Sequence, residues 1–563
     1  MNLQTTLLRN IRRNIHMTTA KEVTSQIWEM ANRLRGNMDA SEYRNYILGF
    51  MFYRYLSERQ EKYLFDNKVF DENPDNISGI NEEYAKEASG EYLPDYLEDI
   101  SGSLGYAIEP QYTWKTIVDE VNNNTITPDT FQNMFESFDN NLRLNSKATQ
   151  DFSGVFSDMN LNNSRLGNTT AARAKSLTNI VGIIDQIDYK DENGKDILAD
   201  IYEYLIAMFA GNSGKKAGEF YTPHEVSEVL AKLATVSLDQ DNIKPSVYDF
   251  ACGSGSLLLT VQEEIDNNVL YYGQELNTTT YNLARMNLMM HGVPYDRMSL
   301  KNADTLEQDW PDGVDAQGID HPRNFDVVVA NPPYSQRWDN DDRKLKDPRF
   351  KDYGLAPKTK ADYAFLLHGL YHLDQNGTMA IVLPHGVLFR GAKEGKIREA
   401  LLKKNQIDAI IGMPAGLFYS TGIPTVVLVL KKNRTNKDIL FIDASKGFEK
   451  GKNQNKLRKE DIDKIINTYK ERKDVERYAH VASLDEIKEN DFNLNIPRYV
   501  DTFVPEPPVD LKKVAADLHE TNIEIQKNQK ELVGMLKELT SDDDDIMDGL
   551  NAIIKELEEE TRD

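Results

Sequence analysis

Cysteine is almost absent from this chain of 563 residues, in which Cys252 is the single thiol. One cysteine cannot form an internal disulfide, and it also excludes a zinc site built from several cysteine ligands. A protein without disulfides is typical of a reducing compartment. The expected location is therefore the cytoplasm.

Long apolar runs are missing as well. No uninterrupted stretch reaches the roughly 20 residues that a membrane-spanning helix needs, so no membrane partner is expected. Residues 1–16 carry arginines and lack both the apolar stretch and the small-residue cleavage site of a secretory signal. Because a second methionine stands at position 17, residues 1–16 are interpreted as an N-terminal extension.

Positive charge is also scarce, because the formal net charge is -25. A protein that holds a nucleic acid by itself usually displays a basic surface. If the substrate is a nucleic acid, either the positive charge is concentrated locally or a basic partner protein brings the substrate.

Residues 17–180 are predicted to form a helical domain. Between Tyr43 and Glu58 the apolar residues recur at three- and four-residue steps, as on one face of an amphipathic helix. The aromatic residues of this stretch are interpreted as part of a core. Residues 151–170 are rich in Asn, Ser and Gly and are expected to form a loop.

Residues 186–445 alternate short β-branched runs with helical segments. This alternation predicts an α/β fold with a doubly wound, mostly parallel sheet and helices on both faces. Eight strands are expected, at residues 247–250, 270–274, 298–302, 325–330, 378–383, 409–412, 425–430 and 439–442. Several are apolar on both faces, as buried parallel strands are. Ligands of such sheets bind at the carboxyl ends of the strands.

The C-terminal part divides into two regions. Residues 446–508 are charged and partly helical, have no readable role, and end in a proline-rich linker. In residues 509–563 a heptad repeat of apolar residues follows, at Leu511, Leu518, Ile525, Leu532 and Leu539. Such a helix needs a partner for its seam, which is either another chain or its own domain, and both stay open. The acidic stretch after Ser541 is expected to be a solvated tail.

A glycine turn follows the first expected strand of the sheet, in Asp249-Phe-Ala-Cys-Gly253-Ser-Gly255-Ser256. Glycines let the backbone turn sharply and approach a ligand closely, and the helix that follows offers unpaired N–H groups. The third glycine of a dinucleotide fingerprint is replaced by Leu258, which disfavours NAD and FAD. Alone, the turn is also compatible with a plain strand-to-helix connection.

Acidic residues follow the next two strands. Glu275 lies 26 residues after Asp249, Asp304 lies 29 residues further on, and Asn331 follows after 27 more. Each step is one βα unit long, so all four side chains are expected at one edge of the sheet. There Glu275 can accept the ribose hydroxyls of a nucleoside, and Asp304 can accept an adenine amine.

The most specific motif is Asn331-Pro332-Pro333-Tyr334, which follows a buried strand. Two prolines hold the chain extended in a rigid loop. The Asn331 side-chain oxygen and the Pro332 carbonyl can accept hydrogen bonds from a planar amino group, while Tyr334 can stack on the ring that carries it. The histidines show no ligand spacing, so no metal is expected.

Together, Asp-x-x-x-Gly-x-Gly and Asn-Pro-Pro-Tyr resemble the amino-methyltransferase family. The upstream segment Gly218-Glu-Phe-Tyr-Thr-Pro223 resembles, more narrowly, the cofactor-binding motif of the modification subunit (HsdM) of type I restriction–modification systems. The resemblance covers most of the chain. Phe250 and Ser256 depart from it, because the family often has Pro and Gly there.

The resemblance implies an S-adenosylmethionine-dependent enzyme that methylates the N6 amine of a flipped adenine in double-stranded DNA. It assigns the methionine end of the cofactor to Glu219, Phe220, Tyr221 and Thr222, the glycine turn to Asp249, Ala251, Gly253, Ser254 and Gly255, the ribose to Glu275, the adenine amine to Asp304, and the target base to Asn331, Pro332, Pro333 and Tyr334.

The resemblance also implies partners. These are a DNA specificity subunit bound through the C-terminal helix and the N-terminal domain, a second copy of the chain, and a motor–nuclease subunit. A separate reading subunit would explain an acidic catalytic chain without a DNA-reading domain. Two alternatives stay open: a methyltransferase acting on an RNA base or a protein glutamine amide, and a non-catalytic scaffold. The intact acidic residues and Asn331 argue against the scaffold.

Overall fold

The computed structural model describes residues 40–127, 129–187, 189, 197–212, 222–239, 241, 244–265, 268–310, 312–314, 317, 320–418, 421–451, 454–502 and 509–560. The chain divides into two compact units, Met1–Asp501 and Thr502–Asp563. The expected N-terminal extension and residues 219–221 of the predicted site lie outside the described residues. Among the described helices, none has the length and apolar character needed to cross a membrane.

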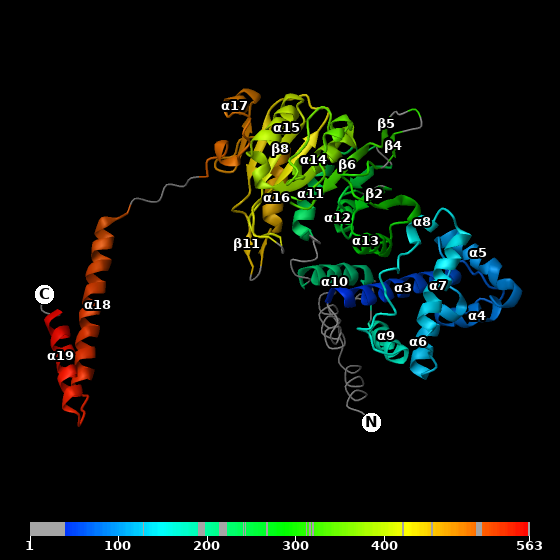
Figure 1. Ribbon diagram of the computed structural model, residues 1–563, viewed down its shortest axis with the longest axis horizontal. Helices are drawn as coiled ribbons and strands as arrows, with labels where there is room; N and C mark the ends of the chain where they lie inside the picture. Colours follow the sequence, from blue (N-terminus) through cyan, green and yellow to red (C-terminus); the bar gives the residue numbers. More distant parts are fainter. Residues whose placement is uncertain are drawn as a thin grey trace. The chain divides into compact units, whose positions relative to one another are not determined.

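The N-terminal part of the first unit is helical (Figure 1). Its helices are α3 (Ala40–Asp66), α4 (Ile80–Glu87), α5 (Leu93–Leu104), α6 (Trp114–Asn123), α7 (Thr130–Asn141), α8 (Thr149–Phe152), α9 (Thr170–Asp185) and α10 (Leu198–Asn212). Helix α3 is buried on most sides, and its Phe50 ring lies 5.6 Å from Phe131 of α7. The expectation that its aromatic residues form a core is confirmed.

The remainder of the first unit is built on a nine-stranded sheet with the order β13-β10-β8-β9-β7-β6-β1-β2-β3. Its strands are β1 (Ser246–Asp249), β2 (Leu270–Glu275), β3 (Met298–Asn302), β6 (Phe325–Ala330), β7 (Leu373–Pro384), β8 (Ile407–Gly412), β9 (Thr425–Lys431), β10 (Ile439–Asp443) and β13 (Ala479–Ala482). All eight expected strands are present. Two small hairpins accompany the sheet, β4 (Asp312–Val314) with β5 (Asp320–Pro322), and β11 (Glu449–Lys450) with β12 (Asn455–Lys456).

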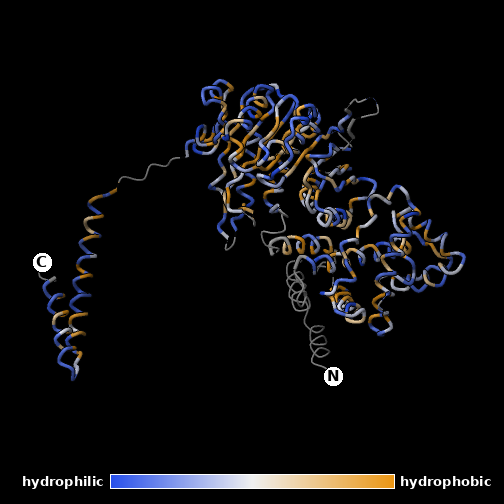
Figure 2. The backbone as a smooth tube through the Cα atoms, in the orientation of Figure 1, coloured by the Kyte–Doolittle hydropathy of each residue, from blue (hydrophilic) through white to orange (hydrophobic). Residues whose placement is uncertain are grey.

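Helices cover both faces of this sheet. They are α11 (His224–Thr235), α12 (Ser256–Glu263), α13 (Thr278–Met290), α14 (Asp362–Tyr371), α15 (Ala392–Lys403), α16 (Lys459–Glu471) and α17 (Leu484–Glu489). Successive residues of β6 enter different apolar cores, since Val327 belongs to one and Val328 to the other. The apolar residues follow the strands in Figure 2. The predicted doubly wound fold is confirmed.

Strand β9 differs from its neighbours in direction. It is apolar on both faces, yet it pairs antiparallel with β7 and with β8. The described residues between β8 and β9 contain no helix, so the chain turns back instead of crossing over the sheet. The apolar pattern therefore identified a buried strand but not its direction.

The sheet also extends past the predicted domain boundary at residue 445. Strand β13 pairs antiparallel with β10, and Ile487, Leu494 and Ile496 are buried in the core of the same unit. Because residues 446–508 are mostly charged, these few apolar residues do not produce a recognisable hydrophobic pattern in the sequence. The structure thus places residues 446–501 with the sheet rather than in a connecting region.

The second unit contains α18 (Leu511–Lys537) and α19 (Asp544–Glu560). Lys537 of α18 forms an ion pair with Glu558 of α19 at 2.5 Å, and Val533 and Ile554 are the buried apolar residues. The expected acidic tail is therefore largely a helix, which corrects the sequence prediction. The heptad residues of α18 are exposed, for example Leu511 at 75% and Leu518 at 60%.

Candidate active site

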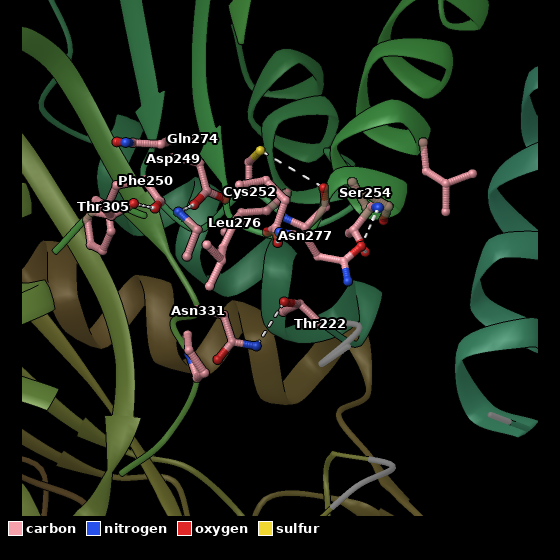
Figure 3. A pocket seen from close by; sticks show the side chains of 18 of the residues that line it. Thr222, Asp249, Phe250, Cys252, Ser254, Gln274, Leu276, Asn277, Thr305 and Asn331 are labelled. Carbon is pink, nitrogen blue, oxygen red and sulfur yellow. Dashed lines mark hydrogen bonds between the residues drawn. The ribbon is translucent and has the colours of Figure 1, made fainter. Parts of the chain in front are cut away.

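A pocket of about 730 Å³ opens at the carboxyl ends of β1, β2, β3 and β6 (Figure 3). Strand β1 lies between β2 and β6, so the chain proceeds from it first to one side of the sheet and later to the other. This reversal is where ligands of open α/β sheets bind. Asp249 and Cys252 lie on one side of the pocket, and Asn331 and Thr222 lie across from them.

The glycine turn connects β1 to α12. Gly253 has φ +55° and Gly255, the N-cap of α12, has φ +80°, a region that only glycine adopts without strain. The Cys252 N–H donates to the Gln274 carbonyl at 3.0 Å, which ties the turn to β2. The turn is therefore held in a shape that exposes backbone groups to the pocket.

Asp249 is the most deeply buried acidic residue of the pocket wall, at 1% exposure. Its Oδ1 accepts a hydrogen bond from the Ala251 N–H at 3.0 Å. Burial, together with the nearby charge of Glu275, raises the pKa of Asp249 to about 8. A cation placed beside this carboxyl group would favour its ionised form.

The other two carboxylates are oriented by backbone amides. Glu275 accepts from the Gly253 N–H at 3.0 Å and from the Asn277 N–H at 2.8 Å. Asp304 accepts from the Leu306 N–H at 2.9 Å. Each side chain is thus fixed by its own loop or by the neighbouring glycine turn.

Asn331 lies on the opposite side of the pocket and is 7% exposed. Its Nδ2 donates to the Thr222 hydroxyl at 2.9 Å, and its Oδ1 accepts from the Tyr334 hydroxyl at 2.7 Å. The Tyr334 ring meets Phe418 edge-on, with centroids 5.9 Å apart and an interplanar angle of 88°. The amide of Asn331 is therefore held in one orientation, with its oxygen toward Tyr334.

An ion-pair network anchors the end of this loop. Ser335 has φ +52°, and its N–H donates to Asp362 at 2.7 Å. The other Asp362 oxygen accepts from Arg390 at 2.6 Å, and Arg390 also pairs with Glu394. Since Asp362 is 1% exposed, the unusual backbone at Ser335 is supported by a buried, fully paired carboxylate.

Most predicted site residues meet in this pocket. Its wall includes Thr222, Asp249, Ala251, Gly253, Ser254, Glu275, Asp304, Asn331, Pro333 and Tyr334. Gly255 and Pro332 adjoin the wall without being among the described residues that line it. Glu219, Phe220 and Tyr221 lie outside the described residues.

Arg44 is a pocket residue that sequence reasoning missed. It lies on α3, is 3% exposed, and is the one lysine or arginine among the described residues that line the cavity. Ile206 of α10 joins it from the helical part of the chain. No sequence motif identifies Arg44 as a site residue, because the neighbouring residues form the buried apolar face of a helix.

Three residues on the far side of β1 form a group with metal-ligand chemistry. Ligand atoms of Asp309, His368 and His372 lie within 4.8 Å of one another, which linear spacing did not reveal. Arg349 donates to His368 Nδ1 at 3.1 Å, and the His372 ring contacts Asp309 at 2.8 Å. Burial, with His372 and Arg349 nearby, holds the pKa of His368 well below its ordinary value. With these partners, the three side chains form a hydrogen-bonded polar cluster.

Comparisons with known proteins identify the family of this chain. A family model described as N-6 DNA Methylase matches residues 193–506, and one described as HsdM N-terminal domain matches residues 23–184. The chain is 38% identical to the type I restriction enzyme MpnII methylase subunit of Mycoplasma pneumoniae, over 92% of this chain and 96% of that one. It is 31% identical to the MjaVII methylase subunit of Methanocaldococcus jannaschii, over 86% and 79%.

A solved structure gives the same result. The crystal structure of a type I restriction-modification system methyltransferase subunit from Streptococcus thermophilus is 45% identical to this chain, with a TM-score of 0.78. The match covers 86% of this chain and 100% of that one.

Proposed function

The chain belongs to the N-6 DNA methylase family and is a type I restriction–modification methylase subunit, and from this premise we propose how its pocket methylates adenine N6 in DNA. The observation that carries the proposal is the placement of Asn331 across one cavity from Asp249, Glu275 and Asp304. This arrangement suits a cofactor held on one side and a base held on the other. We infer a cytoplasmic location for this reaction, because a chain with a single cysteine and no internal disulfide is typical of a reducing compartment.

The residues present fit S-adenosylmethionine. When bound, this cofactor supplies a methyl group on a positively charged sulfur, which makes the methyl group an electrophile. The cavity volume of about 730 Å³ is that of a site for a ligand of this size. Glu275 would accept the ribose hydroxyls, Asp304 the adenine amine, and Asp249 would face positive charge at the methionine end.

Arg44 would bind the carboxylate of the methionine part. A carboxylate taken into a largely enclosed site needs a cation or several donors, and guanidinium is suited to both tasks. Arg44 supplies that charge from the helical part of the chain. The family resemblance adds Glu219, Phe220, Tyr221 and Thr222 at the same end.

Asn331 and Pro332 would hold the target amine. Thr222 fixes the amide of Asn331 so that its oxygen accepts, and the Pro332 carbonyl supplies the second acceptor. Two hydrogen bonds from the amine to these oxygens would favour a pyramidal nitrogen whose lone pair points at the methyl group. The chain's contribution is positioning and electrostatics, with no covalent intermediate.

Tyr334 would change its contact when the base arrives. In the structure its hydroxyl donates to the Asn331 oxygen that the amine would use. The amine would share or take over this acceptor, and the ring would stack on the base. Because a paired base cannot reach this depth, the adenine must leave the duplex.

The exposed seam of α18 would bind a specificity subunit that reads the DNA. Leu511, Leu518 and Ile525 are at least half exposed, and a heptad seam is stable only against another helix. The N-terminal domain would provide a second contact in a complex holding two copies of this chain and, at times, a motor–nuclease subunit. Deleting residues 502–563 should release the specificity subunit on gel filtration, whereas an unaltered complex would refute this assignment.

The proposed reaction is tested by incubating the chain with its specificity subunit, S-adenosylmethionine labelled in the methyl group, and either DNA, RNA or protein. We expect label in DNA, at N6 of adenine after digestion to nucleosides. Label confined to RNA or to protein glutamine would overturn the proposed substrate.

A further inference from the structure

A basic hairpin, defined as residues 446–459, has no role in the site described above. It carries six lysines or arginines and one acidic residue, Glu449, in a chain whose net charge is -25. The basic residues are Lys446, Lys450, Lys452, Lys456, Arg458 and Lys459. By contrast, residues 502–563 carry 17 acidic and seven basic residues. Basic residues thus clearly outnumber acidic ones in this segment of the first unit.

The strands of this hairpin present two lysines to solvent. Lys450 of β11 lies opposite Asn455, and Lys456 of β12 lies opposite Glu449. Both lysines are exposed, and within the described part of the chain neither forms an ion pair with a carboxylate. Arg458, in contrast, is paired with Asp461 and Glu460. The positive charge of Lys450 and Lys456 therefore remains available to a ligand.

The hairpin is attached to the wall of the active site. The Asn455 N–H donates to the Gly416 carbonyl at 2.9 Å, and its side chain donates to the Ala415 carbonyl at 2.8 Å. These residues lead directly into Phe418, whose ring contacts Tyr334. Two contact steps thus connect the basic hairpin to the loop that holds the target base. In Figure 1 strand β11 is seen at the edge of the first unit, below the label of α16.

DNA that delivers a base to this pocket brings its backbone to the loops around the pocket, and the hairpin is joined to one of them through Gly416 and Ala415. One strand carries a phosphate about every 3.4 Å of helix axis, so the phosphates that flank a flipped base lie near the mouth of its pocket. An acidic protein would repel them unless cations are placed there. We propose that the basic hairpin, through Lys450 and Lys456, binds backbone phosphates beside the flipped adenine. This inference rests on the proposed function.

Such contacts would position the DNA without reading its sequence. They would also explain how a catalytic chain with a large negative charge engages DNA once a partner has selected the site. The hairpin is suited to this task because its lysines are exposed while Gln454 and Asn455 bond to residues 415–417. Leu457, at 5% exposure, anchors the second strand in the core.

The test uses the full chain in complex with its specificity subunit, carrying the double substitution Lys450→Gln and Lys456→Gln. Binding to a fluorescently labelled duplex is measured by anisotropy over a series of salt concentrations. Each phosphate contact contributes about 0.9 to the slope of log K against log salt, so the slope should become less negative by up to about 1.8. The matched control is Lys470→Gln with Lys473→Gln, which removes the same charge from two exposed lysines, one in the last turn of α16 and one just after the helix.

Calorimetry with S-adenosylhomocysteine monitors the fold of each variant, and its affinity should be unchanged. An equal slope in the hairpin variant and the wild type would overturn the proposal. So would a changed slope accompanied by loss of the specificity subunit on gel filtration, because the hairpin would then be a protein contact. If the wild type with its specificity subunit neither binds nor methylates DNA, the proposed function itself fails, which the wild-type control identifies separately.

Discussion

The two sides of the pocket are built in different ways. On the side of the glycine turn, backbone amides in or next to the strand-tip loops hold the three carboxylates. On the opposite side, the neutral Asn331 is held by Thr222, which lies 109 residues away, and by Tyr334, whose ring leans on Phe418. The first side thus holds its three carboxylates through contacts within and between neighbouring strand-tip loops. The second depends on loops that a substrate can rearrange.

This comparison predicts that substitutions on the two sides have separable effects. Changes near the carboxylates and Arg44 should alter cofactor affinity. Changes around Asn331 should alter turnover while the cofactor still binds. Variants on each side of the pocket test whether cofactor affinity and turnover change independently.

The largest effect is expected for Asn331→Ala. Removing one hydrogen-bonding group that acts in the transition state typically lowers kcat by roughly 100- to 1,000-fold, and methyl transfer should fall by at least this much. The affinity for S-adenosylhomocysteine, measured by calorimetry, should stay within about twofold of the wild type. A comparable loss of cofactor affinity would show that the two sides are not separable.

Arg44→Gln should weaken the cofactor by roughly 10- to 100-fold, because a hydrogen bond to a charged group contributes about 1.5–3 kcal/mol. The informative comparison is with 5′-methylthioadenosine, which lacks the amino-acid part and should bind both forms alike. Arg143→Gln, at an exposed position of the same helical region, is the control. Equal losses for both ligands would refute a carboxylate contact.

Cofactor affinity should also depend on pH through Asp249. Burial raises its pKa to about 8 in the free pocket, while a ligand with a nearby ammonium group favours the ionised form. Affinity for S-adenosylhomocysteine should therefore rise with pH, by up to about tenfold per unit below 8, and level off above it. Asp249→Asn should abolish this slope. A wild-type affinity that is flat or falls with pH would contradict the assignment.

The same shift has a consequence for stability. Because burial raises the pKa of Asp249 in the folded chain above its ordinary value of 3.8, the stabilising contribution of this carboxyl group is complete below pH 4. That contribution is lost as the pH rises toward 8. Without ligand, the Tm of the wild type should fall as the pH rises from 4 to 8. The Tm of Asp249→Asn should fall less over the same pH range. Equal slopes for both forms would argue that Asp249 is ionised throughout.

The smallest effect is expected for Tyr334→Phe. Phenylalanine keeps the ring that stacks on the base and loses the hydroxyl that occupies Asn331, so the methylation rate should change only a few-fold. Tyr334→Ala removes the ring and should cost roughly 1–3 kcal/mol in binding of the flipped base. Steady-state kinetics with duplex DNA measures both. If Tyr334→Phe were as impaired as Tyr334→Ala, the hydroxyl would have a direct role.

The strand tips were predictable because parallel βα units repeat at a regular length. The positions of Asp249, Glu275, Asp304 and Asn331 follow from that repeat alone. Arg44 was not predictable, since it reaches the pocket across about 200 residues of chain from a helix that looks like core. A resemblance in sequence does not locate such a contact.

The remaining differences have a similar origin. The direction of β9 is decided by the missing crossover helix, which an apolar run does not report. Strand β13 and helix α19 each rely on a few apolar residues within charged segments, where hydrophobic periodicity is weak. In α19, Met547, Leu550 and Ile554 recur at three- and four-residue steps, a signal that its acidic composition obscures.

Methyl transfer to adenine N6 at Asn331 can be followed in the DNA of living cells. N6-methyladenine is mapped in the DNA of cells that make the complex with either the wild-type chain or Asn331→Ala. We predict methylation at a single recurring sequence with the wild type and none with the variant. DNA without N6-methyladenine in wild-type cells, or the same methylation with the variant, would contradict the claim.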